Sequence, residues 1–203
     1  AVNKFLRIGH VLHLGFTMDC GVAGIYLMKP LSEYPEEGSA VFQIYRMLIA
    51  LQHRGQETAG FTSYNAEREQ DPLDTRTGEG LVGEVFNTKD TEGFRQIMRT
   101  YAGTAAIGHV RYATSGNNDG NGETQRIRWK KEAQPFHRPH GHVKKHFALA
   151  FNGNLANFPE LRADLEGHGD YRLSKRIDTE ALAYVLAINI NHELEDAKRQ
   201  GRE

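Results

Sequence analysis

The chain of 203 residues is 39% hydrophobic and 25% charged, which is typical of one globular domain and excludes a disordered protein. Its net charge of −1 at pH 7 argues against partners that attract by charge, such as nucleic acid or an anionic membrane surface. The single cysteine excludes an intrachain disulfide framework and a cysteine-rich zinc site, and it suits a reducing cytoplasm.

The segment before this cysteine, residues 1–19, is expected to be a leader or propeptide. Its apolar run is short and is interrupted by His13, and Asp19 is a poor residue to precede a signal-peptidase site. A true chain start at Met18 remains an alternative. No run in the sequence reaches the ~20 apolar residues of a transmembrane helix.

The hydrophobic pattern of the rest of the chain predicts alternating strands and helices. We expect strands at 20–28, 59–64, 104–112 and 147–151, and helices at 41–54, 91–101, 159–166 and from 178 to 191 or beyond. Residues 65–80 are polar and read as a hairpin or an exposed excursion, and the glycine-rich residues 115–123 read as a loop. The dinucleotide and P-loop fingerprints are absent, so a layered α+β sandwich suits the pattern better than a doubly wound sheet.

The helix at 41–54 is the clearest of these elements. Ser39 is its expected N-cap, and Gly55 can end it. Its spacing predicts a broad apolar face made of Phe42, Tyr45, Leu48, Ile49 and Leu51.

The cysteine itself, Cys20, is the candidate for chemistry. A lone cysteine is most often a buried hydrophobic residue, and it acts as a nucleophile only with a proton carrier, an oxyanion hole and a substrate clamp around it. If the bond between Asp19 and Cys20 is cut, the new α-amino group, with a pKa of ~7.7–8, lies beside the thiol and can take and return its proton.

Six sequence blocks carry a family resemblance. They lie at 20–25, 51–60, 80–86, 108–116, 133–136 and 152–155. In this order they resemble the class II glutamine amidotransferase domain. The blocks LQHRGQETAG and GLVGEVF are most similar to the glutaminase half of the amidophosphoribosyltransferases of purine synthesis, rather than to the asparagine synthetase or glucosamine-phosphate synthase branches.

The resemblance implies an N-terminal-nucleophile fold, a four-layer αββα sandwich in the α+β class. It also implies roles for residues. Cys20 would attack the side-chain amide of glutamine, and the Asn152 side chain with the Gly153 N–H would form the oxyanion hole. Arg111 would hold the α-carboxylate of the substrate and Asp178 its α-ammonium group.

Further residues complete the implied site. Arg54 and Gly55 would line the pocket of the nucleophile, with Gly55 allowing a close backbone approach. Tyr112 and Thr114 would belong to a loop that closes over glutamine. No metal or organic cofactor is expected for the glutaminase step.

Simpler interpretations of single residues stay open at this stage. Arg111 could be an ordinary partner in a surface ion pair, and Asp178 could be only an N-cap. The pair Asn152 and Gly153 also matches a common type I′ hairpin turn.

The chain departs from the family by lacking a phosphoribosyltransferase half. We expect an amidotransferase domain at 20–192 and a charged tail or linker at 193–203 that frays. Ammonia would pass to a synthase domain or subunit elsewhere, and the oligomeric state stays open. Two rivals remain: a glutaminase subunit of a glutamate-synthase-like or other amination complex, and a non-catalytic interaction domain whose Cys20 stays blocked by an uncleaved leader.

The segment 126–146 is more basic and richer in histidine than we expect of the family. A solvated hairpin or a docking surface for the partner domain is favoured over nucleic-acid binding. The histidines at 137, 140, 142 and 146 could bind a metal, but no cysteine or acidic ligand lies among residues 137–146. We therefore expect no metal site.

Overall fold

The computed structural model describes residues 20–68, 71–112, 131–138, 145–167, 173–174 and 177–201. The expected leader, Thr114 and the glycine-rich loop at 115–123 lie outside these residues, as do His140 and His142. In the described part of the chain, no helix is long and apolar enough to cross a membrane.

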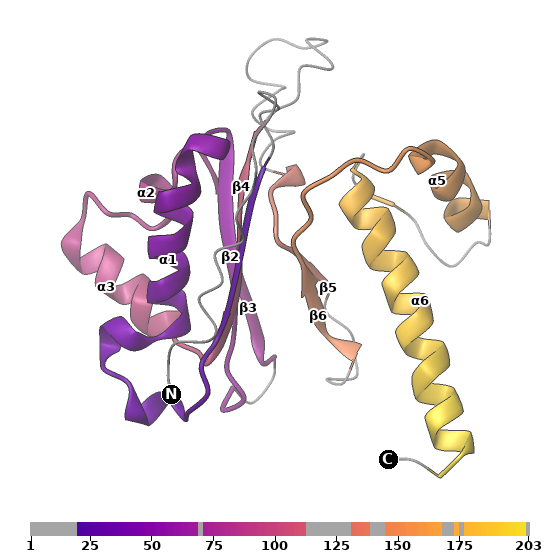
Figure 1. Ribbon diagram of the computed structural model, residues 1–203, viewed down its shortest axis with the longest axis horizontal. Coiled ribbons are helices and arrows are strands. Elements are labelled where there is room, and N and C mark those ends of the chain that lie inside the picture. Colours follow the sequence, from indigo (N-terminus) through magenta and orange to yellow (C-terminus); the bar gives the residue numbers. More distant parts are fainter. Residues whose placement is uncertain are drawn as a thin grey trace, which may run out of the picture.

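The described elements form four layers (Figure 1). The first layer holds three helices, α1 (Ala40–Leu51), α2 (Val82–Val85) and α3 (Thr91–Thr100). The second layer is a sheet of β1 (Gly21–Tyr26), β2 (Thr58–Tyr64), β3 (Leu73–Glu79) and β4 (Ala105–Arg111). The third layer pairs β5 (Phe136–Arg138) with β6 (Phe147–Leu149), and the fourth holds α5 (Phe158–Gly167) and α6 (Asp178–Arg199). The expected αββα sandwich of the α+β class is confirmed.

The larger sheet has the strand order β1-β4-β2-β3, and all its neighbours are antiparallel. The hairpin of β2 and β3 confirms one of the two interpretations of residues 65–80. Because Gly21 pairs with Val110, the start of β1 lies at the end of β4. This register brings Cys20, the residue before β1, next to Arg111 and the residue that follows it.

Helix α1 packs against the sheet and beside α3. Its buried residues, Val41, Ile44 and Leu48, face the sheet, where Gly108 of β4 leaves room that a Cβ would fill against Ile44 and Leu48. The flank beside this face is aromatic, and the rings of Phe42 and Tyr45 both meet Phe94 of α3.

One detail of the helix prediction is wrong. Ile49 is 45% exposed, although it lies two helical turns after Phe42 on the same side of α1 and Phe42 packs on Phe94. Ser39 holds the expected N-cap position of α1, although its side chain makes no capping hydrogen bond. Asp90, by contrast, caps α3 by accepting a hydrogen bond from the Glu92 N–H at 3.1 Å.

Helix α6 is longer than the periodicity indicated. It continues to Arg199, so most of the stretch that was expected to fray is helical. Residues 193–199, ELEDAKR, are mostly good helix formers, and Lys198 and Arg199 lie in the last turn, where positive charge favours the helix dipole. Leu165 of α5 and Ala181 of α6 belong to a second hydrophobic cluster that joins these two helices.

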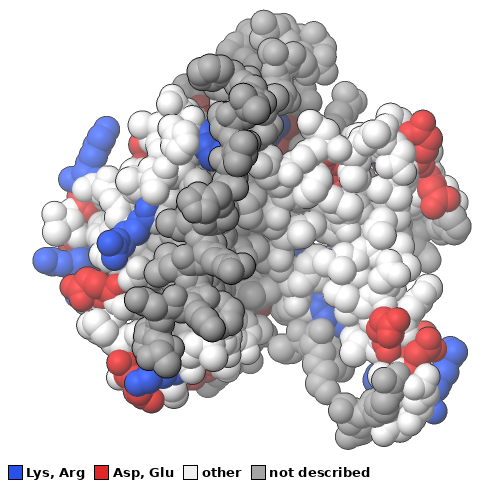
Figure 2. Space-filling view, viewed as in Figure 1, with Lys and Arg blue, Asp and Glu red and all other residues white. Residues whose placement is uncertain are grey.

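Charged side chains do not gather into one patch on the described part of the face shown in Figure 2. Lysines, arginines and acidic residues lie there mostly toward the margins of the molecule, with both signs close together. This distribution agrees with the net charge of −1.

Candidate active site

Cys20 is held by contacts from three of the sequence blocks. Its carbonyl oxygen accepts hydrogen bonds from Asn152 Nδ2 at 2.9 Å and from Arg54 Nε at 3.3 Å. Its Sγ lies 3.9 Å from the carbonyl oxygen of Tyr112. The start of β1 therefore has a defined position between the end of β4 and the turn after β6.

A small cavity of about 100 Å³ opens beside Cys20. Six residues that the sequence proposed for the site line it: Cys20, Arg111, Tyr112, Asn152, Gly153 and Asp178. Six further residues also line it: Glu132, Gln134, Phe151, Asn154, Ile177 and Thr179. The cavity lies where β4, the turn after β6 and the start of α6 meet.

Of the described residues that line the cavity, Arg111 is the one cationic side chain, and Glu132 and Asp178 are the carboxylates. Arg111 NH1 lies 3.1 Å from Glu132 Oε2, and the two side chains are only 20% and 5% exposed. The pair is thus not the surface ion pair that was the alternative for Arg111. A guanidinium has five N–H donors, so this contact leaves others that can bind a ligand.

The turn after β6 is tied to α6 by Asp178. The Leu155 N–H donates to Asp178 Oδ2 at 3.0 Å, while Ile177 holds the N-cap position of α6. Asp178 is therefore not merely an N-cap. The type I′ hairpin alternative is also wrong: that turn needs positive φ, and neither Asn152 nor Gly153 has it.

Comparison with known proteins leads to the same family that the six sequence blocks resemble. Residues 123–198 match the family described as a glutamine amidotransferase domain. The chain is 37% identical over 171 residues to an amidophosphoribosyltransferase of Archaeoglobus fulgidus, covering 83% of this chain and 30% of the relative. The chain belongs to the glutamine amidotransferase family.

Other relatives of this amidotransferase domain carry the same name. Amidophosphoribosyltransferase 2, chloroplastic, of Arabidopsis thaliana is 36% identical (84% of this chain, 25% of the relative), and the Escherichia coli amidophosphoribosyltransferase is 31% identical (85% and 28%). A solved structure, described as the allosteric regulatory enzyme of purine biosynthesis, superposes with a TM-score of 0.57 at 34% identity and covers 80% of this chain and 28% of that one. The domain thus spans about 30% of the first relative's length.

Two of the predicted site residues of the amidotransferase domain lie behind the cavity instead of lining it. Arg54 reaches the carbonyl of Cys20, as described above. Gly55 lies against the main chain of Arg111, where a Cβ would overlap backbone atoms, and its φ of −168° is ordinary extended backbone. Gly55 therefore serves close packing of the turn after α1 on the end of β4.

Gln52 and Gln134 are polar residues that sequence reasoning left without a role. The Gln52 side chain donates to the Gly55 carbonyl and accepts from the Val82 N–H at 2.7 Å, which joins this turn to α2. Gln134 is buried and accepts from the Phe151 N–H at 2.8 Å, which fixes the chain just before Asn152. Gln134 supports the cavity as part of its lining, and Gln52 supports it from outside.

Glu132 was also missed. It lies 21 residues after Arg111 in the chain and next to the AQPF block, but no spacing rule links it to an arginine on β4. The only available signal was an acidic residue in an otherwise basic segment. Its role depends on tertiary packing.

Two groups in this region have shifted pKa values. Burial raises the pKa of the Cys20 thiol above its ordinary value, although the charge of Arg111 opposes this. Burial and the nearby Arg111 lower the pKa of His109 from 6.5 to about 4, so this fully buried imidazole is neutral at pH 7. Among the described residues that line the cavity there is no histidine.

Proposed function

We propose that this domain hydrolyses glutamine through a thioester on Cys20 and releases ammonia for a synthase domain outside the 203 residues. The observation that carries this proposal is the position of the lone thiol at a small cavity with Arg111 and Asp178. The α-carboxylate of glutamine would bind the guanidinium of Arg111, and its α-ammonium would bind the carboxylate of Asp178. This pairing suits a zwitterionic amino acid.

Catalysis would begin with removal of residues 1–19, which frees the α-amino group of Cys20. Because burial raises the pKa of the thiol, the thiol is protonated at neutral pH and needs a base. The α-amino group would take the thiol proton while Sγ attacks the carbon of the side-chain amide. This base lies within the nucleophile's own residue, so we propose no metal or cofactor for the step.

The oxyanion that forms would accept hydrogen bonds from Asn152 Nδ2 and from the Gly153 N–H. Asn152 already donates one amide hydrogen to the Cys20 carbonyl, and its second remains for the substrate. Collapse of the intermediate would break the C–N bond, and the protonated α-amino group would return the proton to the departing ammonia. Water would then hydrolyse the thioester to glutamate and the free thiol. Tyr112, and Thr114 outside the described residues, would cover the bound glutamine.

The acceptor of ammonia is proposed from the relatives. Their name, amidophosphoribosyltransferase, points to transfer onto a phosphoribosyl substrate in purine biosynthesis, and this domain spans only about 30% of the first of them. We place the activity in a reducing cytoplasm, which would keep the Cys20 thiol free. A glutaminase subunit that serves another amination complex would bind a different synthase in a pull-down.

Replacing the nucleophile tests the proposal. The Cys20→Ala protein should lose glutamine hydrolysis and labelling by a glutamine-mimicking electrophile, because both need the thiolate. Gly167→Ala, at a position where an added Cβ meets nothing within 4 Å, is the matched control and should keep both. Labelling that persists undiminished in Cys20→Ala would refute the assignment.

A further inference from the structure

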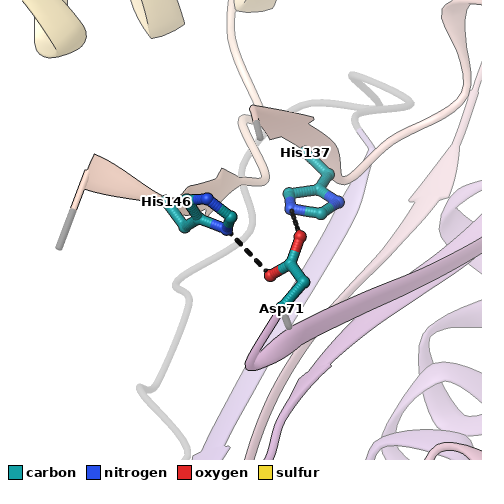
Figure 3. A group of neighbouring side chains, drawn as sticks. All are labelled: Asp71, His137 and His146. Atoms are coloured by element: carbon teal, nitrogen blue, oxygen red, sulfur yellow. Dashed lines mark hydrogen bonds and ion pairs between the residues drawn. The ribbon is translucent and has the colours of Figure 1, made fainter. Parts of the chain in front are cut away.

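Asp71, His137 and His146 meet at a second polar cluster (Figure 3). Asp71 Oδ1 lies 2.9 Å from His146 Nδ1, and Asp71 Oδ2 lies 3.3 Å from His137 Nε2. One ligand atom from each residue lies within 4.8 Å of the other two. None of the three lines the cavity beside Cys20.

The fold brings these residues together from three places. His137 of β5 pairs with Ala148 of β6, and His146 lies two residues before Ala148, so both imidazoles project from one face of the small sheet. Asp71 comes just before β3 and its carboxylate also accepts the Leu73 N–H at 2.9 Å, which fixes its direction. The cluster thus joins the β2–β3 hairpin to the small sheet.

The absence of an acidic ligand was the reason for expecting no metal in the histidine-rich segment. Asp71 supplies that ligand from far along the chain. Two imidazoles and a carboxylate are a common donor set for zinc. Ligands bound at 2.0–2.1 Å in a tetrahedron lie about 3.3 Å apart, close to the two separations from Asp71.

Burial and bonding also favour an ion here. The His146 side chain is 7% exposed and that of His137 is 20%, while Asp71 is 30% exposed and leaves an open side. His137 Nε2 is buried and makes no hydrogen bond of normal geometry among the described residues, although it lies beside the carboxylate. A bound cation would give this buried imidazole nitrogen the partner that it lacks among the described residues. A cavity of about 560 Å³ lined partly by His146 offers a path from solvent.

We propose that Asp71, His137 and His146 bind one zinc ion, with water as the fourth ligand, and that the ion braces the hairpin against the small sheet. Both imidazoles bind as neutral ligands and Asp71 contributes one negative charge, so the site retains one net positive charge when filled. The site is separate from the thiol chemistry and does not depend on the proposed glutaminase function.

Zinc chloride alone is the probe. After equilibrium dialysis of the full chain, the wild-type protein should retain a single equivalent of zinc. Asp71→Asn, which keeps the size of a partly exposed side chain, and His137→Ala should each weaken binding at least ~10-fold. His192→Ala on α6 is the matched control and should bind zinc like the wild type.

A stability readout distinguishes this site from zinc held elsewhere. Zinc at about 100 times its Kd should lower the unfolded fraction about 100-fold in the wild type and in His192→Ala, because the ion binds only the folded site. For Asp71→Asn, whose Kd should be at least ~10-fold higher, the same zinc concentration should lower the unfolded fraction about tenfold at most. Zinc binding or protection that is equal in Asp71→Asn, His137→Ala and the wild type would overturn the proposal, as would a wild-type protein that retains no zinc.

Discussion

Only some of the polar groups around Cys20 could be predicted from the sequence. Arg111 and Asn152 belong to recognisable blocks, Asp178 was implied by the family resemblance, and all three line the cavity. Glu132 was invisible because its contact with Arg111 joins residues that only the fold brings together. The same reason hid Asp71 from His137 and His146.

Arg111→Lys tests the substrate clamp. Lysine keeps the charge opposite Glu132 but loses the planar fork that holds a carboxylate through two hydrogen bonds. We expect the KM for glutamine to rise about tenfold or more, with a smaller change in kcat, because the contact lies away from the reacting amide. Steady-state glutaminase kinetics measure both values, and an unchanged KM would remove Arg111 from the clamp.

At the scale of elements, hydrophobic periodicity located most helices and strands, but β3 lies in the polar residues 65–80, which were interpreted as a hairpin or an exposed excursion. Periodicity could not fix which strands pair, although that pairing builds the site: the register of β1 on β4 puts Cys20 beside Arg111. The extent of α6 and the exposure of Ile49 were wrong because propensity and packing, and not apolar spacing alone, decide them.

Gly55→Ala tests the packing of the turn after α1 on β4. An added methyl group would overlap the main chain of Arg111, which cannot move without disturbing the sheet. We expect a loss of about 1–3 kcal/mol in the free energy of unfolding.

Urea unfolding of both alanine variants measures this effect. Gly167→Ala, in open space in α5, should be neutral or slightly stabilising, because alanine favours helix more than glycine does. If Gly55→Ala were as stable as Gly167→Ala, the close approach of the turn to Arg111 would be wrong.

For the whole molecule, His109 links stability to pH. Gly108 and His109 are neighbours on β4 and therefore point to opposite faces of the sheet. Because Gly108 faces α1, the imidazole of His109 faces the side of the small sheet. Its pKa is about 4 in the folded protein and is expected near 6.5 in the unfolded chain. As the pH falls from about 6.5 to about 4, His109 therefore binds a proton in the unfolded chain but stays neutral in the folded protein.

The contribution of His109 to stability is present above pH 6.5 and is lost as the pH falls toward 4. Between about pH 6.5 and pH 5 the expected loss is about 2 kcal/mol. Urea unfolding across this range should show a steeper decline for the wild type than for His109→Gln, which does not titrate. Equal slopes for the two proteins would contradict the low pKa.

The central claim concerns the whole chain and its first nineteen residues: glutamine hydrolysis requires an N-terminal Cys20. Intact mass and N-terminal sequencing of the form labelled by a glutamine-mimicking electrophile test this claim most directly. We expect every labelled molecule to begin at Cys20, and glutaminase activity to rise in proportion to the fraction processed. Full activity and labelling in a protein that still carries residues 1–19 would contradict the account.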